Sequence, residues 1–382
     1  MDYEQTKELQ MLRKMYADFA ENEVEPIAAE CDEEERFPSE TIPKLAKLGM
    51  MGIPFPKEYG GAGGNTVAYA AAIEELAKKD LTTSTIVAAH TSLCTYPIFH
   101  FGTEEQKRKY VPQLASGKVL GAFGLTEPEA GSDASATQTE AVLEGDHYVL
   151  NGTKCFITNA SEAGIFVVTA VTDKNAKGTH GISAFIVERD FPGFSVGPHE
   201  KKMGIRGSAT SDLIFEDCIV PKENLLGQEG KGFKIAMNTL DGARVGVAAQ
   251  AMGLAEGAID ETVKYVSERV QFGKRLSQFQ NTQFQLADMK TKCDAAHLLV
   301  FRAAQAKDNN DPNLGMYSAM AKLYSGDTAS DVTRRCLQLF GGYGYIRDFP
   351  IERMMRDAKI TEIYEGTAEV QRMVISRAMG VK

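Results

Sequence analysis

Residues 357–372 place the carboxylate of Glu365 inside a Tyr-Glu-Gly-Thr break between two helix-like stretches. Gly366 lets the backbone come close to a ligand and leaves its N–H free to polarise a carbonyl group. Beside it, Glu365 could remove a proton from the carbon next to that carbonyl. This pair suits abstraction of an α-proton from a thioester. An isolated glutamate at a helix end is more often an ordinary surface residue, so the interpretation depends on the rest of the chain.

The size and charge of the chain narrow the classes of protein to consider. Its 382 residues are enough for two or three domains, and a formal net charge of −10 disfavours nucleic acid or an anionic membrane as the main partner. The six cysteines lie far apart, without metal-ligand spacing, so we expect reduced thiols and no metal site. Residues 1–8 lack a signal or transit pattern, and no apolar run approaches the roughly 20 residues that span a bilayer. We therefore expect a cytoplasmic protein without membrane insertion.

The first 120 residues have the pattern of helices. Apolar residues recur at three-to-five-residue spacing up to Val24, which predicts an amphipathic helix that ends near Pro26. Further helices are expected over 39–48, over 67–79 and from there to about residue 101, with Ser39 as an N-cap and Thr103 with Gln106 as a capping box.

Between residues 121 and 227 the pattern changes to short runs of β-branched and aromatic residues separated by turn signals. No amphipathic segment of helix length alternates with these runs, which favours a small β-barrel over a Rossmann unit. The runs are 147–150, 166–171, 182–187 and 213–215.

From residue 231 the chain again has the pattern of helices, and four long segments with short connections predict an antiparallel four-helix bundle. The segments are 232–267, 280–307, 313–339 and 350–380. The expected fold class is therefore α+β multidomain, with an N-terminal helical domain (1–120), a middle β-barrel domain (121–229) and a C-terminal helical bundle (230–382).

Two segments of the middle region could hold a flat cofactor. Residues 123–133 offer free backbone N–H groups and hydroxyls to an aromatic heterocycle, although such a segment could equally be a polar linker between domains. In 151–159, Phe156 and Thr158 share one face of a strand, so a ring could stack on a flat cofactor while a hydroxyl hydrogen-bonds to it. The alternative is a strand with ordinary alternation.

Two breaks in the C-terminal helices could bind phosphate. Residues 268–274 set a guanidinium beside exposed N–H groups, which suits a pyrophosphate, although charged helix ends are usually solvated. Residues 338–344 form a glycine-rich break, but a helix precedes it and Arg347 stands at the last glycine of the G-x-G-x-x-G pattern, which argues against a Rossmann fingerprint. The chain also lacks the P-loop, H-E-x-x-H and G-x-S-x-G motifs.

These segments, in this order, resemble the acyl-CoA dehydrogenase family over essentially the whole chain. The bacterial short-chain type, butyryl-CoA dehydrogenase, looks most similar. Branched- and long-chain members take their base from an earlier helix, at a place corresponding to Gly242 or its neighbours, where this chain has no glutamate. Glu365 is thus the only base that matches a motif. The motifs are Leu-Thr-Glu-Pro (125–128) with Gly-Ser-Asp (131–133), Ile-Thr-Asn (157–159), Glu-Arg (268–269) with Gln-Phe-Gly (271–273), Gly-Gly (341–342), Met-Arg-Asp (355–357) and Ile-Tyr-Glu-Gly-Thr (363–367).

The resemblance implies non-covalent FAD as the cofactor and an acyl-CoA or enoyl-CoA as the substrate. The residues that would hold the isoalloxazine ring and its neighbourhood are Phe123, Leu125, Thr126, Ser132, Phe156 and Thr158. Those that would reach the ADP half, in part from a neighbouring subunit, are Arg269, Gln271, Phe272, Gln280, Gln338, Gly341 and Gly342, with Thr367 and Glu369 also contacting the dinucleotide. The implied substrate positions are Ser132, Asp241, Arg244, Tyr364 and Gly366, of which Asp241 and Arg244 share one helix face towards the CoA moiety.

The implied reaction is α,β-dehydrogenation of a short-chain acyl-CoA to the trans-2-enoyl-CoA, or its reverse. Glu365 would remove the α-proton, and flavin N5 would accept the β-hydride. The implied partners are an electron-transferring flavoprotein and further copies of the chain, in a homotetramer arranged as a dimer of dimers. The alternatives are a reductase of another enoyl-CoA, including an aryl-substituted one, an acyl-CoA oxidase that passes electrons to O₂, and a non-catalytic flavin-binding scaffold.

Overall fold

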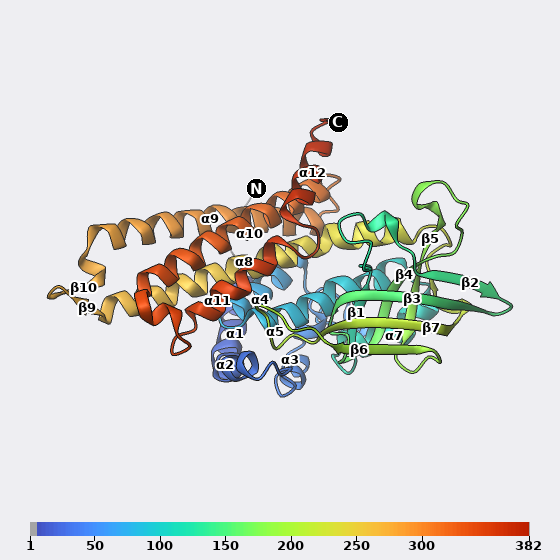
Figure 1. Ribbon diagram of the computed structural model, residues 1–382, viewed down its shortest axis with the longest axis horizontal. Helices are drawn as coiled ribbons and strands as arrows, with labels where there is room; N and C mark the ends of the chain where they lie inside the picture. Colours follow the sequence, from blue (N-terminus) through green and yellow to red (C-terminus); the bar gives the residue numbers. More distant parts are fainter. Residues whose placement is uncertain (1–5, 382) are drawn as a thin grey trace.

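The computed structural model describes residues 6–381, which form a long helical body with a β domain at one end (Figure 1). The expected order of a helical region, a β region and a second helical region is confirmed. The first region contains α1 (Lys7–Phe19), a π-helical turn (Ala20–Val24), α2 (Glu25–Glu33), α3 (Ile42–Lys47), α4 (Thr66–Ala77), α5 (Leu81–Ala88), a second π-helical stretch (Ala89–Thr95), α6 (Tyr96–Phe101) and α7 (Glu104–Ala115).

The prediction that the N-terminal helix ends near Pro26 is wrong. The chain stays helical from α1 through the π-helical turn Ala20–Val24 into α2, and Pro26 lies in the first turn of α2. Proline lacks an N–H, but a first-turn N–H has no acceptor within its own helix. The wider π turn before it allows the helical path to continue.

The expected start of the second helix at Ser39 is also wrong, whereas the capping box predicted at Thr103 and Gln106 is confirmed. Helix α3 begins at Ile42 with Pro43 in its first turn, because the fixed φ of proline suits that position. Ser39 lies in the turn before it and makes no cap. At the start of α7, Thr103 and Gln106 exchange the two hydrogen bonds of a capping box, at 3.2 and 3.0 Å.

The β domain is one sheet of eight strands, and all four predicted strand runs fall inside its strands. Their order is β6-β7-β3-β2-β4-β5-β8, and β1 pairs in parallel with β4. Strands β3 and β7 are antiparallel, but their register shifts between Lys154 and Ile157, which leaves two residues of β3 unpaired. The strands are β1 (Leu120–Gly124), β2 (Glu140–Glu144), β3 (His147–Thr158), β4 (Ala163–Val171), β5 (Ile182–Glu188), β6 (Phe194–His199), β7 (Thr210–Pro221) and β8 (Leu225–Leu226).

The C-terminal region is built on three long helices that lie side by side, α8 (Gly232–Glu268), α9 (Gln280–Asp308) and α10 (Leu314–Phe340) (Figure 1). The fourth predicted helical segment, 350–380, is divided into α11 (Ile351–Ala358), a 3₁₀ turn (Lys359–Glu362) and α12 (Ala368–Ala378). A short hairpin of β9 (Val270–Gln271) and β10 (Lys274–Arg275) joins α8 to α9. None of the helices among residues 6–381 combines the length and apolar composition needed to cross a bilayer.

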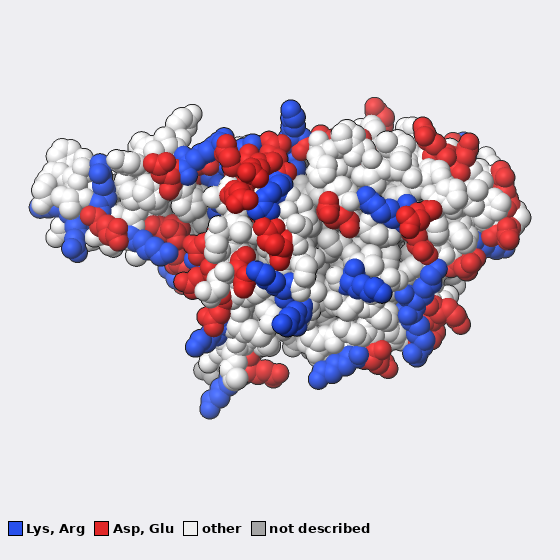
Figure 2. Space-filling view, turned by 90° about the horizontal axis from the view of Figure 1, so that it is seen from below, with Lys and Arg blue, Asp and Glu red and all other residues white. Residues whose placement is uncertain are grey.

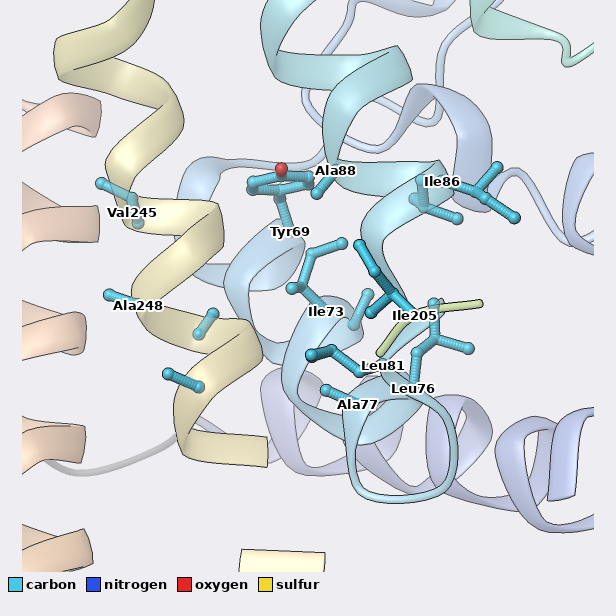
Figure 3. Packing of buried hydrophobic residues seen from close by; sticks show 14 of the residues in the cluster. Tyr69, Ile73, Leu76, Ala77, Leu81, Ile86, Ala88, Ile205, Val245 and Ala248 are labelled. Carbon is cyan, nitrogen blue, oxygen red and sulfur yellow. The ribbon is translucent and has the colours of Figure 1, made fainter. Parts of the chain in front are cut away.

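Helix α4 of the first region packs directly on α8, and this contact joins the two helical regions. Tyr69 and Ile73 of α4 and Val245 and Ala248 of α8 belong to one buried apolar cluster (Figure 3). Further along, α8 carries Gly253, where a Cβ atom would lie 2.1 Å from the carbonyl oxygen of Glu74. The helices can therefore approach this closely only because no side chain stands there. From the other side, the carboxylate of Asp308 accepts the Thr66 N–H at 2.7 Å and so caps α4.

Candidate active site

Glu365 and Gly366 form a turn in the left-handed backbone region, between the 3₁₀ turn Lys359–Glu362 and α12. Their φ angles are +52° and +93°. The second is readily adopted only by glycine, and the first is uncommon for a residue with a side chain. Thr367 ends the turn, because its Oγ1 accepts the Val370 N–H at 3.4 Å and caps α12. The turn directs the Glu365 side chain into the protein, among α4, α8, α9 and α10.

The carboxylate of Glu365 is available to accept a proton. The residue is half-buried, but its Oε2 atom is buried and has no hydrogen-bond partner among residues 6–381. Burial raises the pKa of the Glu365 carboxyl to about 7, and the positive charges of Lys322, Arg244 and Lys307 limit that rise. A carboxylate with such a pKa is a suitable general base near neutral pH.

Two side chains hold the backbone of this turn. Lys322 of α10 donates from Nζ to the Gly366 carbonyl oxygen at 2.6 Å. Gln371 of α12 donates from Nε2 to the same oxygen at 2.7 Å and to the Glu365 carbonyl oxygen at 3.3 Å. Sequence reasoning missed both residues. A buried lysine on the alanine-rich, inward face of α10 is the signal that could have identified Lys322.

A buried polar chain lies on the other side of Glu365. The Tyr364 hydroxyl donates to Oε1 of Gln250 at 2.6 Å, and Nε2 of Gln250 donates to Oγ1 of Thr85 at 3.1 Å. Gln250 and Thr85 are buried. Sequence reasoning identified Tyr364 but missed the two residues behind it. This chain of hydrogen bonds occupies the space next to the base with groups that are costly to displace.

Asp241 and Arg244 lie one turn apart on α8, as their spacing predicts. Oδ1 of Asp241 lies 2.5 Å from Nη1 of Arg244, so the two residues form an ion pair within the helix. Side-chain exposure falls from 37% at Asp241 to 4% at Arg244. The pair therefore extends from the surface towards Glu365. The positive charge of Arg244 lowers the pKa of the Glu365 carboxyl.

A cavity of about 430 Å³ lies beside this site, between the ends of α4, α6 and α9. Its wall includes Tyr69, whose hydroxyl is buried, and Lys307, whose Nζ lies 4.3 Å above the ring of Tyr96. Burial lowers the pKa of Lys307 to about 8. A Cβ atom on Gly242 would lie 2.6 Å from this Nζ, so the ammonium takes the space that a side chain there would need. Sequence reasoning gave no signal for Lys307.

The predicted cofactor loop in the β domain is fixed by a buried ion pair. Nζ of Lys154 lies 2.6 Å from Oε1 of Glu127, and both side chains are buried. Glu127 also accepts the N–H groups of Gln138 and Thr139, while Lys154 donates to the Leu125 carbonyl at 3.2 Å. The loop after β1, with Leu125, Thr126 and Ser132, is thereby held in one shape. Glu127 and Lys154 were not predicted as partners.

Phe156 presents an exposed aromatic ring beside that loop. It lies in the register shift of β3 with a φ of +60°, and its ring is 65% exposed. The preceding N–H, of Cys155, donates to the Thr126 carbonyl at 2.8 Å, which joins this strand to the loop. Phe123 and Thr158 are half-buried nearby on β1 and β3. An exposed flat ring, a hydroxyl and a rigid loop fit a planar heterocycle such as isoalloxazine.

The residues expected at the ADP half lie at the opposite end of the molecule. Arg269, Gln271, Phe272 and Gln280 surround the hairpin at the end of α8, and Gln338, Gly341 and Gly342 follow the end of α10. Arg269 stacks 5.2 Å from the ring of Tyr343, which brings these two groups together. The 37 residues of α8 span about 55 Å and separate them from the β domain (Figure 1). Within one chain, these residues lie too far from Phe156 and the loop after β1 to hold the same dinucleotide.

Thr367 and Glu369 lie elsewhere again, at the start of α12 and next to Glu365. Thr367 uses its side chain as the helix cap, and the Glu369 side chain is largely exposed. One chain thus brings Glu365, Gly366, Tyr364 and Arg244 into one site and leaves the three groups of expected cofactor residues at separate places.

Three family models match the chain in succession. They are described as the N-terminal, middle and C-terminal domains of acyl-CoA dehydrogenase, and they match residues 6–118, 122–218 and 230–380.

Two curated relatives cover nearly the whole chain. A short-chain specific acyl-CoA dehydrogenase of Clostridium acetobutylicum is 58% identical, over 98% of this chain and 99% of its own length. An acryloyl-CoA reductase (NADH) of Anaerotignum propionicum is 53% identical, over 99% of this chain and 95% of its own length.

Two solved structures have the same fold. Butyryl-CoA dehydrogenase from Megasphaera elsdenii has a TM-score of 0.97 at 50% identity, covering 99% of this chain and 100% of the other. A chain in a structure of the electron transferring flavoprotein of Acidaminococcus fermentans has a TM-score of 0.97 at 55% identity, covering 99% of both chains.

Proposed function

Because this chain belongs to the acyl-CoA dehydrogenase family, we propose that it converts a short-chain acyl-CoA into the trans-2-enoyl-CoA, or carries out the reverse reduction. The observation that carries the proposal is the Glu365 carboxylate, which has a buried oxygen without a hydrogen-bond partner in the part of the chain that the structure describes and lies beside Gly366 in a left-handed turn. Abstraction of an α-proton needs such a base next to a group that polarises the thioester carbonyl.

The cofactor is FAD, which supplies the hydride acceptor when it is bound. Phe123, Leu125, Thr126, Ser132, Phe156 and Thr158 would hold its ring system, and the exposed Phe156 ring beside a rigid loop supports that assignment. Arg269, Gln271, Phe272, Gln280, Gln338, Gly341 and Gly342 would hold the ADP half of a neighbour's cofactor, with Thr367 and Glu369 as further contacts.

Different residues of this chain would polarise the substrate, accept its proton and orient it. The Gly366 N–H would donate to the thioester oxygen and stabilise the negative charge that grows there. Oε2 of Glu365 would accept the α-proton, and its raised pKa makes it a stronger base than an exposed carboxylate. Asp241 and Arg244, which lead from the surface to this point, would orient the CoA moiety together with Ser132.

A panel of acyl-CoA and enoyl-CoA thioesters tests this function directly. Acyl-CoA should bleach the flavin of the purified protein, and enoyl-CoA should reoxidise the reduced protein. Both directions are expected, because curated relatives include a dehydrogenase and an acryloyl-CoA reductase. Failure of every acyl-CoA and enoyl-CoA to change the flavin spectrum would leave only the scaffold alternative, and a preference for aryl-substituted enoyl-CoA would correct the substrate.

The buried chain behind Tyr364 predicts a limit on acyl length. Gln250→Ala removes the amide that joins Tyr364 to Thr85 and opens space beside the base. We expect the ratio of kcat/KM for octanoyl-CoA over butyryl-CoA to rise at least about tenfold, since even one further methylene accepted in an apolar pocket contributes about 1–3 kcal/mol. Gln113→Ala on α7, whose amide donates to the Lys109 carbonyl oxygen at 2.8 Å, serves as the matched control. An unchanged ratio in Gln250→Ala, with flavin retained, would place the acyl chain elsewhere.

We infer a homotetramer, arranged as a dimer of dimers, in which a neighbouring chain completes each cofactor site. The separation of the two groups of cofactor residues along α8 supports this arrangement. Large apolar side chains are also exposed at the hairpin end and on α12, as expected of surfaces that are covered in an assembly. They include Phe272, Phe284, Tyr345, Met373 and Met379.

Arg269→Ala tests the shared site. The guanidinium would bind the neighbour's pyrophosphate, so its loss should lower flavin retention and tetramer stability together, since a ligand that bridges an interface couples the two. Flavin content after gel filtration and the dissociation of the tetramer on dilution measure both effects. Lys264→Ala, on the exposed surface of α8 one turn earlier, should change neither. Loss of flavin with unchanged tetramer stability would argue for a cofactor site within one chain.

We further propose a cytoplasmic location and the domain boundaries 1–120, 121–229 and 230–382. The six cysteines are free and buried, which suits a reducing compartment. The change from helix to strand at β1 and back to helix at α8 supports the boundaries.

A further inference from the structure

We propose that Lys322 is a positioning residue for the reaction, whose bond to the Gly366 carbonyl holds the catalytic turn in shape and whose charge helps Glu365 to ionise. This inference rests on the proposed role of Glu365 as the base. Lys322 lies in the first half of α10, is 1% exposed, and has no carboxylate within ion-pair distance among residues 6–381. Its ammonium group therefore binds the turn and acts on the charge of Glu365 without forming an ion pair.

The hydrogen bonds at the turn fix two successive peptide units. Lys322 and Gln371 both donate to the Gly366 oxygen, from two different helices, at 2.6 and 2.7 Å. Gln371 also donates to the Glu365 oxygen at 3.3 Å. The Glu365 carbonyl and the Gly366 N–H belong to one planar trans peptide unit and point in opposite directions. Holding that carbonyl therefore fixes the direction of the N–H that would polarise the thioester.

The turn needs this support because its conformation is not one the chain adopts freely. Glu365 has a φ of +52°, which persists only where surrounding contacts impose it. A residue with a side chain would not fit at Gly366 unless Gln371 moved, because a Cβ atom there would lie 2.8 Å from Nε2 of Gln371. The backbone thus packs tightly against the amide that holds it.

The charge of Lys322 acts on Glu365 across the same turn. The groups that face Glu365 are Lys322 of α10, Arg244 of α8, Lys307 of α9, and the hydroxyls of Tyr69 and Tyr364. The groups that face Lys322 are Glu365, Arg244, Glu362 and Asp327. Burial lowers the pKa of Lys322 to about 8, so the ammonium is charged at neutral pH and favours the ionised form of Glu365. A neutral side chain in its place raises the pKa of Glu365.

Three variants of the holoenzyme separate the two roles of Lys322. Lys322→Gln keeps a hydrogen-bond donor and removes the charge, Lys322→Met removes both, and Gln371→Leu removes a donor without a change of charge. The measurement is the rate of flavin reduction by butyryl-CoA per bound flavin, between about pH 5.5 and 9.5, and Lys322 is mostly charged in the parent below about pH 8, where the acid limb of the parent lies. Flavin content and melting temperature are recorded for each variant.

The two lysine variants should move the acid limb of the pH–rate profile upward by about one pH unit, because Glu365 then ionises at higher pH. Lys322→Met and Gln371→Leu should also lower the plateau rate about 10- to 100-fold, because the Gly366 N–H is no longer held in place. Gln371→Leu should leave the acid limb where it is. A purely structural lysine would alter melting temperature and flavin content without moving the acid limb.

An acid limb that stays in place in both lysine variants, with flavin retained, would overturn the proposal. If Lys322→Met does not fold, Lys322→Gln and Lys322→Arg decide it, since the arginine variant keeps the charge and should keep the acid limb of the parent. Failure of the proposed function gives a different result, because the parent protein itself would then show no reduction by any acyl-CoA.

Discussion

Glu365→Gln should abolish reduction of the bound flavin by butyryl-CoA while the fold and the flavin are retained. The amide is nearly the same size as the carboxylate but cannot accept the α-proton. General-base catalysis contributes about 10²- to 10⁴-fold to a rate, so we expect a loss in that range. Stopped-flow measurement of flavin bleaching under anaerobic conditions gives the rate. A variant that still bleaches within about tenfold of the parent, or roughly 1.4 kcal/mol in barrier, would exclude Glu365 as the base.

Glu362→Gln is the matched control for this variant. Glu362 lies three residues earlier, pairs with Lys359 at 2.5 Å, and does not carry the unpartnered oxygen of the site. It should leave the rate within a few-fold of the parent.

A stability readout supports the same assignment. Burial raises the pKa of Glu365 to about 7 in the folded protein, above the 4.5 of an ordinary glutamate, so the parent loses stability as pH rises from about 4.5 to about 7 and loses little more above that. Glu365→Gln removes this loss, and the difference in melting temperature between the variant and the parent should grow from about pH 5 to about pH 7 and then level off.

The catalytic turn could be predicted from the sequence because its signal is local. A glycine directly after a glutamate, in a break between helical stretches, is enough to suggest a turn with a polarising N–H. The structure places both residues in left-handed backbone, as such a turn requires. The order of helical, β and helical regions was also predictable, since hydrophobic periodicity changes sharply at both borders.

Two of the residues that support the site could not be predicted, because they come from distant parts of the chain. Lys322 reaches Gly366 from α10 and Gln250 reaches Tyr364 from α8, whereas Gln371 lies only five residues after Gly366, on the helix that follows the turn. Each is a single polar residue in an otherwise apolar helix face. Sequence spacing within one helix carries no information about which turn such a residue meets.

The Met-Arg-Asp motif (355–357) has a structural role that local sequence does not reveal. In the Met-Arg-Asp segment, Arg356 pairs with Asp32 of α2 at 2.6 Å, and Asp357 accepts the N–H of Ile205 at 2.5 Å. These bonds join α11 to the N-terminal helices and to the loop between β6 and β7. The segment therefore stabilises the approach of three regions and does not touch the carboxylate of Glu365.

The second large effect concerns the acceptor of the electrons. Protein reduced by substrate should pass electrons to an electron-transferring flavoprotein at least about a hundredfold faster than to NAD⁺ or O₂. The chain has no nicotinamide fingerprint, and a structure of an electron transferring flavoprotein contains a chain 55% identical to this one. Lys and Arg alternate with Asp and Glu over the face shown in Figure 2. Such a polar surface suits a partner that docks transiently.

Stopped-flow mixing of the substrate-reduced protein with each acceptor decides between these routes. Oxidation by the flavoprotein should saturate with its concentration, and its rate should fall as salt is raised from about 0.05 to 0.5 M, because charged rims that steer encounter are screened. An inert protein of similar net charge, added in place of the flavoprotein, controls for non-specific effects. Rapid, saturable oxidation by O₂ would identify an acyl-CoA oxidase instead, and direct reduction of NAD⁺ would refute the flavoprotein as the obligatory partner. A rate that is insensitive to salt would keep the partner but move its docking surface to an apolar region.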